Sequence, residues 1–291
     1  PRWEIWAIER LIIGFCFSGV YITSESWLNA SATNETRGQA LSAYMIVQML
    51  GIIGAQILMN TADPAGYLLF IIPSVLVSFA FLPILLSAQP APQFSTIQRM
   101  SFATLFRVSP LGCVGIFLMG GVFSAIFGMA SVWGSARGLS VTEISAFVAA
   151  IYIGGLVLQY PVGWLSDHGD RRVIVLALAV LGTLACLATL MLQPDIWGLL
   201  LTAAIIGGVA NPVYSLLLAY TNDFLDAKDM AAASAGLLFI NGVGAITGPL
   251  ITGWLMETLG PDGFWAYIGA LLLVLALYTG WRLSLIHISE P

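Results

Sequence analysis

Nine apolar stretches, each about 20 residues long, fill most of this 291-residue chain. That length is what a helix needs to cross the hydrocarbon core of a bilayer. Only 9% of the residues are charged, too few to cover the surface of a water-soluble domain of this size. Because a chain in lipid must satisfy its backbone hydrogen bonds internally, we expect each stretch to be a helix. The stretches are Trp6–Leu28, Ala40–Asn60, Tyr67–Ala88, Leu111–Gly134, Ile144–Leu165, Val173–Leu192, Ile196–Tyr220, Ala231–Met256 and Phe264–Leu283.

The composition therefore predicts an all-α membrane protein, a polytopic helical bundle surrounded by lipid. The alternation of apolar and polar residues that marks a membrane β-barrel strand is absent from the sequence. The three cysteines fall inside predicted spans, far apart in sequence, and are expected to behave as small hydrophobic residues. We expect a monomer that binds no nucleic acid, metal or cofactor.

The basic residues lie mostly on one side of the predicted membrane. If the loops are numbered alternately, one set contains seven basic residues and the other contains two, Arg2 and Arg137. This positive-inside bias places the C-terminus in the cytoplasm and the residues near Pro1 outside. An outside N-terminus without a signal sequence suggests further spans upstream. The seven basic residues are Arg37, Arg99, Arg107, Arg171, Arg172, Lys228 and Arg282.

The chain also matches itself when it is shifted by 193 residues. Ile12-Ile13-Gly14 falls on Ile205-Ile206-Gly207, and Asn29 falls on Asn222. The matched spans are six crossings apart, so the two copies point the same way across the membrane. Parallel repeats of this kind form the two halves of some transporters. Restoring the missing copy of the fourth to sixth spans adds about three spans before Pro1, which makes twelve in two pseudo-symmetric bundles.

This repeat gives the expected domain organisation. Residues 1–88 are predicted to be the remainder of an N-terminal bundle with three spans. The polar segment 89–109 is predicted to be a cytoplasmic linker, and residues 110–283 a C-terminal six-helix bundle. The tail, residues 284–291, resembles translated sequencing-adapter read-through and is expected to be non-native.

The strongest local motif is Gly163-Trp-Leu-Ser-Asp-His-Gly-Asp-Arg-Arg172, at a predicted cytoplasmic junction of two spans. It resembles the loop signature of the major facilitator superfamily, in which Gly163, Asp167, Arg171 and Arg172 match and His168 and Asp170 depart. Gly163 is expected to let two helices approach closely. The resemblance implies that Asp167 and Arg171 form, with Asp223, a charge cluster that gates the cytoplasmic face. The alternative is an ordinary charged loop that obeys the positive-inside rule.

A second and shorter motif, Arg10-x3-Gly14, resembles the fourth-helix motif of the same family. Arg10 is expected to face a partner or an aqueous cavity, because a charge inside a span is costly, or else to reach the outer surface with its long side chain. Glu25 is either a buried carboxyl that carries a proton or an interfacial residue.

Small residues mark two symmetry-related spans, where they would allow close helix packing. The resembled family's antiporter signature ends in Gly-Pro in the first half, where this chain has Ala55-Gln56, so that signature is weakened. Plain packing and a role in rocking both remain open. The predicted packing residues are Gly14, Gly51, Gly54, Gly244, Gly248 and Pro249.

Several polar residues within the spans could line a central cavity, or could each form an interhelical hydrogen bond. The most suggestive is Asn211, because it precedes a mid-span proline that frees a backbone carbonyl. The set is Gln48, Tyr152, Gln159, Asn211, Tyr214 and Asn241.

These observations predict a secondary transporter in the cytoplasmic membrane of a bacterium, which moves a small solute by alternating access between two helical bundles. No histidine lies inside a span where it could pair with a serine nucleophile, so an enzyme is not expected. The chain has no Walker motif, so ATP is not expected to drive it directly. A membrane sensor without transport activity is the alternative. The substrate is not readable from the sequence, and proton coupling is an open possibility.

Overall fold

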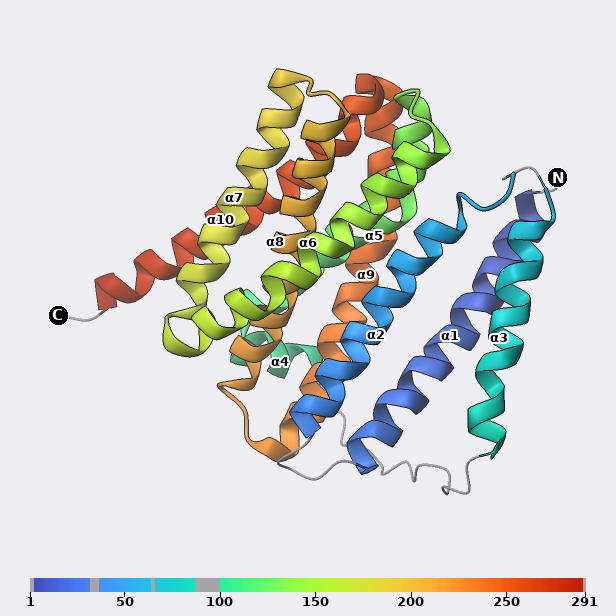
Figure 1. The fold of residues 1–291 in the computed structure, drawn as a ribbon. Helices are drawn as coiled ribbons and strands as arrows, with labels where there is room; N and C mark the ends of the chain where they lie inside the picture. The colour runs from blue at the N-terminus through green and yellow to red at the C-terminus, as the bar shows by residue number, and fades with distance from the viewer. Residues whose placement is uncertain (1–2, 32–36, 64–65, 87–99, 290–291) are drawn as a thin grey trace. The chain divides into compact units, whose positions relative to one another are not determined.

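In the computed structural model, residues 3–31, 37–63, 66–86 and 100–289 are described. They are almost entirely helical, as Figure 1 shows. The elements are α1 (Trp3–Ser31), α2 (Arg37–Leu58), α3 (Leu68–Leu86), α4 (Phe102–Val108), α5 (Pro110–Ala136), α6 (Val141–His168), α7 (Arg171–Leu192), α8 (Ile196–Asn222), α9 (Ala227–Leu259), the 3₁₀ turn η1 (Gly260–Asp262) and α10 (Gly263–Ser289).

Each of the nine predicted spans lies on one α-helix of the described residues, from α1 to α3 and from α5 to α10. The seven-residue helix α4 was not expected, because it is too short to register as a span and lies within the predicted linker. By length and composition, five apolar stretches of the described residues could cross a membrane. They are Pro110–Ala136, Val141–His168, Arg171–Leu192, Ile196–Asn222 and Ala232–Ser284, the last of which contains α9 and α10.

The chain divides into two compact units. The first consists of residues 1–51 and 65–96, and the second of residues 52–64 and 97–291. The predicted linker 89–109 belongs partly to the undescribed residues, and the described part forms α4. α10 continues through residues 284–289 of the predicted tail.

One pair of helices in the predicted repeat starts at matching positions. α1 begins at Trp3 and α8 at Ile196, which are 196 − 3 = 193 residues apart, the same shift that aligns the two sequences. Residue 37 at the start of α2 corresponds to residue 230, in the first turns of α9. The start of α9 at Ala227 differs from the shifted position by three residues, and the arrangement of the two copies as symmetric bundles stays a prediction.

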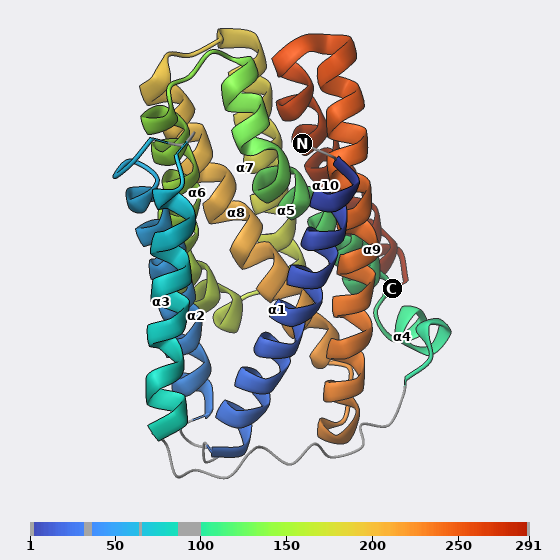
Figure 2. The same ribbon diagram turned by 90° about the vertical axis from the view of Figure 1, so that its right-hand side faces the viewer.

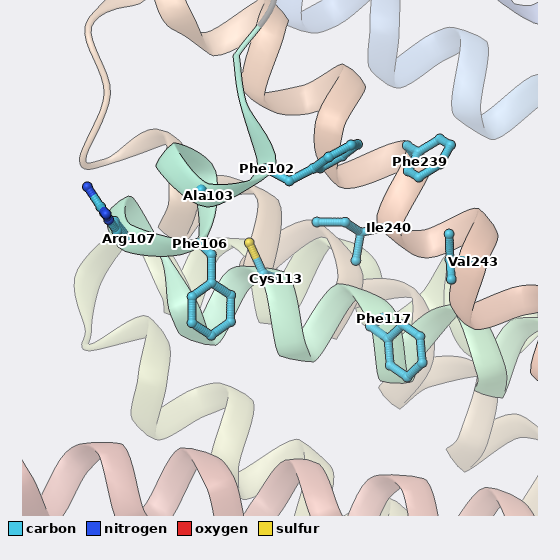
Figure 3. Close-up of a pocket in the computed structure, with 9 residues that line it drawn as sticks. All are labelled: Phe102, Ala103, Phe106, Arg107, Cys113, Phe117, Phe239, Ile240 and Val243. Carbon is cyan, nitrogen blue, oxygen red and sulfur yellow. The ribbon is translucent and has the colours of Figure 1, made fainter.

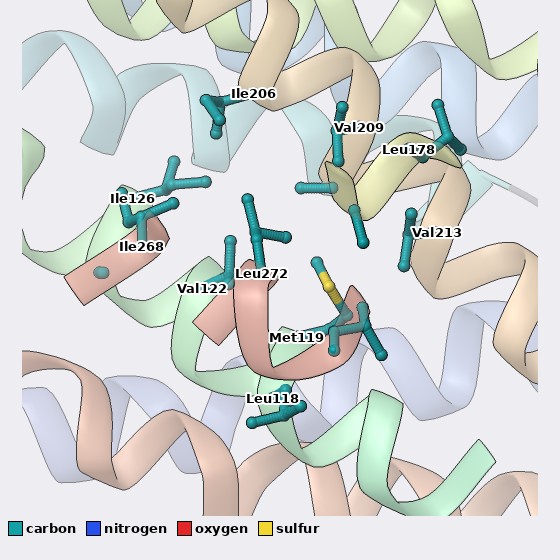
Figure 4. Close-up of a cluster of buried hydrophobic side chains, with 14 of the residues drawn as sticks. Leu118, Met119, Val122, Ile126, Leu178, Ile206, Val209, Val213, Ile268 and Leu272 are labelled. Carbon is teal, nitrogen blue, oxygen red and sulfur yellow. The ribbon is translucent and has the colours of Figure 1, made fainter. Parts of the chain in front are cut away.

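In the second unit, α5 to α10 run alongside one another (Figures 1 and 2). α5 packs mainly against α9, α6 against α8, and α7 against α10. Apolar side chains from α5, α7, α8 and α10 meet in a core in which Met119, Val122 and Val213 are fully buried (Figure 4). The outward side chains are also apolar, as expected for helices in contact with lipid.

Glycines bring the backbones of α6 and α8 into direct contact. A Cβ atom added to Gly154 of α6 would collide with the carbonyl oxygen of Ala204 in α8, and one added to Gly207 of α8 would collide with that of Ile151 in α6. We call this contact the α6–α8 seam. Small residues allow such close helix approach in membranes, where packing rather than hydrophobic burial holds helices together.

One end of the second unit is tied by a polar cluster that joins three connections. Arg137, after α5, donates a hydrogen bond to Gln193 at 2.6 Å and lies 3.6 Å from the carboxylate of Asp262 in η1. Gln193, which follows α7, donates to Asp262 at 3.0 Å. Gln193 has a backbone φ of 45°, the left-handed conformation that commonly ends a helix. The predicted gating cluster belongs to the other ends of these helices.

Candidate functional site

The signature motif forms the end of α6, a two-residue turn and the start of α7. α6 ends at His168, and α7 begins at Arg171. The intervening Gly169 is extended, and Asp170 is the N-cap of α7. The turn places Asp167 and Arg171 one helical turn apart in sequence, with an Arg171 guanidinium nitrogen 3.5 Å from an Asp167 carboxylate oxygen.

Arg171 also reaches across to the end of α8. Its Nη1 donates a hydrogen bond to Oδ1 of Asp223 at 3.1 Å, shorter than its distance to Asp167. The Arg171 side chain is 22% exposed, against 68% for Asp167 and 49% for Asp223, so the arginine is the inner member of the three. The structure thus brings together the three residues that the sequence grouped, and joins the ends of α6, α7 and α8 within one unit. We call them the Arg171 cluster.

The neighbouring Asp170 has two local roles that the sequence analysis missed. Its Oδ1 accepts a hydrogen bond from the backbone N–H of Arg172 at 2.9 Å, which caps α7. Its two carboxylate oxygens also accept hydrogen bonds from Nε and Nη2 of Arg172, the shorter at 2.7 Å. These bonds hold the pKa of the Asp170 carboxyl below its ordinary value. An aspartate directly before a helical run is a recognisable N-cap signal, and it accounts for the departure from the signature at this position.

His168 and Gly163 complete the motif. The imidazole of His168 contacts the carbonyl oxygen of Trp164 through Nδ1 at 2.8 Å and lies against the Trp164 ring, with 4.7 Å between ring centroids. An added Cβ at Gly163 has no described atom within 4 Å. The close helix contact expected at Gly163 is therefore not seen in the described residues, and the seam glycines Gly154 and Gly207 make such a contact instead.

Three of the predicted cavity residues form hydrogen bonds in the second unit. Gln159 of α6 donates to the Ser215 hydroxyl of α8 at 3.1 Å. Asn211 donates to the carbonyl of Gly207 in its own helix at 3.2 Å, and Asn241 of α9 donates to the carbonyl of Ile116 in α5 at 3.1 Å. All three side chains are partly buried, so each satisfies the need of a polar group inside a bundle for a partner.

The two predicted cavity tyrosines join a continuous group of rings. Tyr214 of α8 meets Phe123 of α5 edge to face at 5.8 Å between centroids. Phe123 stacks on Phe127 at 5.6 Å, and Phe127 stacks on Tyr152 of α6 at 5.5 Å. We call these four residues the ring surface. The two phenylalanines were missed because an aromatic residue within an apolar span gives no signal that separates it from ordinary core.

The part of the chain that matches a known family lies in the second unit. Residues 112–285 match the family model described as Major Facilitator Superfamily. The chain belongs to this superfamily. Its curated relatives include the uncharacterized MFS-type transporter YE1530 of Yersinia enterocolitica, 26% identical over 276 residues, which are 92% of this chain and 70% of the relative.

Two further relatives in the superfamily have the same kind of name. The uncharacterized MFS-type transporter YcaD of Escherichia fergusonii is 24% identical over 259 residues, and that of Salmonella arizonae is 26% identical over 261 residues. Each alignment covers 87% of this chain but only 65% of the relative. This chain therefore spans about two thirds of the length of the superfamily relatives that it matches. Its apolar helices and its family together make it an integral membrane protein.

The second superfamily motif lies in α1, in the first unit. The Arg10 guanidinium lies 5.1 Å from the centre of the Trp6 ring, one helical turn earlier, and the side chain is exposed within the described residues. An added Cβ at Gly14 has no described atom within 4 Å. Glu25 lies in α1 and Gln48 in α2, where Gln48 is partly buried; the side chain of Glu25 lies outside the described residues.

The remaining predicted packing residues differ between the two copies. Added Cβ atoms at Gly244 and Gly248 of α9 would collide with the Phe117 carbonyl and the Ser124 hydroxyl of α5, so both glycines pack closely. Pro249 is exposed. At Gly51 and Gly54 of α2 an added Cβ has no described atom within 4 Å. A packing role for these two stays a prediction.

An open groove of about 570 Å³ lies between α4, α5 and α9 (Figure 3). Its lining is apolar apart from Arg107 of α4. None of the predicted cavity residues lines it. The groove and the polar residues of α6 and α8 are therefore separate features of the unit. The lining residues are Phe102, Ala103, Phe106, Arg107, Cys113, Phe117, Phe239, Ile240 and Val243.

Proposed function

We propose that this chain is part of a secondary transporter in a bacterial cytoplasmic membrane, which moves a small solute by alternating access between the bundle of residues 1–88 and that of residues 110–283. Family membership and relatives named as transporters support the proposal. The single observation that carries it is the Arg171 cluster. One guanidinium bridges the ends of two other helices, at the position of the superfamily's loop signature.

The energetics of the cluster favour a role in motion over a role in stability. Ion pairs that are this exposed contribute about 1 kcal/mol or less to folding. A contact that is weak and close to solvent can be made and broken at little cost, which is what a gate needs. We propose that the Arg171 cluster holds α6, α7 and α8 together at the cytoplasmic face in one state and loosens in another.

Transport is tested with proteoliposomes that contain the protein expressed from its complete gene. The vesicles are loaded with the small-molecule extract of the host cells. We expect at least one solute to leave these vesicles faster than it leaves protein-free vesicles, with the difference lost when Arg171 is replaced by alanine. Mass spectrometry of the external medium identifies the solute. Equal release from both kinds of vesicle, with and without an imposed proton gradient, would favour the sensor instead.

The proposed orientation gives a separate prediction. Green fluorescent protein fused after residue 283 should fluoresce in a bacterial host, because the proposed C-terminus is cytoplasmic and this reporter folds poorly after export. The same reporter inserted at residue 138, in the connection between α5 and α6, should stay dark. The opposite pattern in whole-cell fluorescence, with equal amounts of fusion protein, would invert the topology and place the Arg171 cluster outside.

A further inference from the structure

Polar side chains lie beside the ring surface. This distinguishes it from the apolar, lipid-facing sides of the unit. Tyr152 and Gln159 are seven residues apart on α6 and so lie on one face of that helix. Ser215 of α8 accepts a hydrogen bond from Gln159 and so lies beside this face. Exposed side chains on α7 are aliphatic by contrast, such as Leu184 and Leu187. Carboxamides and hydroxyls avoid hydrocarbon, so this surface is suited to an aqueous or solute-filled space.

The helices that present the ring surface lack charge along their length. α5 and α8 contain no Asp, Glu, Lys, Arg or His. In α6 these residue types are confined to Glu143 in the first turn and to Asp167 and His168 in the last. A solute on this surface therefore meets aromatic faces, phenol groups and the Gln159 carboxamide, with no ionic partner from the middle of these helices.

The rings themselves offer a planar ligand an accessible face. Phe127 is 53% exposed, and Phe123, Tyr152 and Tyr214 are partly exposed. The Phe123–Phe127 and Phe127–Tyr152 pairs are nearly parallel, at 5° and 12°, so the stacked arrangement has a common direction that another ring could continue. Offset stacking with aromatic side chains favours planar π systems, and nearby amide groups add hydrogen bonds.

We propose that the ring surface of Phe123, Phe127, Tyr152 and Tyr214, with Gln159 and Ser215, binds an uncharged aromatic solute that carries hydrogen-bonding groups. The inference rests on the proposed function, of which it names the substrate class. A cation would also interact with aromatic faces, but along α5, α6 and α8 it would meet no carboxylate between the end turns to replace its hydration, and an anion would meet no basic side chain there.

Three ring compounds of nearly equal shape test this proposal: neutral nicotinamide, anionic nicotinate and cationic 1-methylnicotinamide. Saturation-transfer difference NMR with the detergent-purified protein, expressed from its complete gene, detects weak binding directly and needs no transport. We expect a clear signal for nicotinamide and a signal at least fivefold weaker for both ions. Binding of either ion at least as strong as that of nicotinamide, or the absence of any nicotinamide signal, would overturn the proposal.

Variants locate the binding. Tyr152→Ala and Tyr214→Ala should each lower the nicotinamide signal about fivefold, whereas Tyr214→Phe, which keeps the ring, should retain most of it. Phe106→Ala is the matched control, since that ring is 49% exposed but lies on α4. If loss of signal in the alanine variants is equalled in Phe106→Ala, binding is not at the ring surface. Size-exclusion profiles confirm that each variant is folded.

The outcome for the substrate class is separable from that for transport. If nicotinamide binds at the ring surface but no solute crosses the vesicle membrane, the proposed transport fails and the site stands. If a solute is transported in an Arg171-dependent way but Tyr152→Ala and Tyr214→Ala leave its rate unchanged, the site is wrong and the transporter stands.

Discussion

Replacing Gly207 by alanine is expected to destabilise the protein by about 2–3 kcal/mol, although alanine is the better helix former by about 1 kcal/mol. The added methyl group would collide with the backbone carbonyl of Ile151 across the α6–α8 seam. A backbone group has no rotamer to change, so the two helices must move apart. That separation opens gaps along the seam and costs packing contacts that no other interaction replaces.

Gly242→Ala is the matched control. Gly242 also lies inside a helix, α9, but an added Cβ there has no described atom within 4 Å. This variant should keep its stability or gain up to about 1 kcal/mol. Unfolding in mixed micelles with increasing SDS, followed by intrinsic fluorescence, gives both values. Equal stability of the two alanine variants would contradict the close contact at the seam.

The double variant sharpens the test. Gly154→Ala meets the same seam from the α6 side, through the carbonyl of Ala204. Once one methyl group has separated the helices, the second should cost much less. The double variant Gly154→Ala, Gly207→Ala should therefore lose clearly less stability than the sum of the losses in the two single variants. Full additivity would mean that the two glycines act at independent sites.

Reversing the charge of Arg171 is expected to lower the transport rate at least tenfold while leaving the amount of folded protein nearly unchanged. Arg171→Asp places a third carboxylate beside Asp167 and Asp223, so attraction becomes repulsion at the ends of α6, α7 and α8. Folding should tolerate the change, because both aspartates are about half exposed or more and such pairs are worth about 1 kcal/mol or less. The rate is measured for the solute identified in the vesicle assay.

Restoring the pair in reverse is the decisive arm of this experiment. Combining Arg171→Asp with Asp223→Arg should recover a substantial part of the rate, since the cross-helix ion pair can form again with its charges exchanged. Arg137→Gln, which alters the polar cluster at the other end of the unit, serves as the control and should transport normally. A wild-type rate for Arg171→Asp alone would show that the Arg171 cluster does not gate transport.

The sequence was sufficient for the helices because long apolar stretches in lipid have one way to satisfy their backbone groups. It was also sufficient to group Asp167, Arg171 and Asp223, since the motif and the loop numbering place all three on one side of the membrane. It could not find α4, whose seven residues lie in a polar, proline-containing segment.

The glycines show where sequence reasoning stops. The chain contains several glycines within spans, but which of them touches a partner depends on how the helices cross, a property of no single helix. Gly163 was expected to allow close contact but has no described atom near an added Cβ, whereas Gly154 and Gly207 were not among the predicted packing residues and form the seam. In the same way, a role for Phe123 and Phe127 in a binding surface could be inferred only from their contacts with the tyrosines of α6 and α8.

Backbone contact along two helix pairs also decides where permeation cannot occur. Carbonyls of one helix fill the hollows left by glycines of the other, both between α6 and α8 and between α5 and α9. The gap among Ile126, Phe147 and Trp265, deeper in the unit, has no room for a water molecule. A single file of water therefore cannot form through these parts of the interior, and protons cannot leak along it. The interior of the second unit therefore blocks water and protons at these places, and a transported solute must pass along the outer surface of the unit.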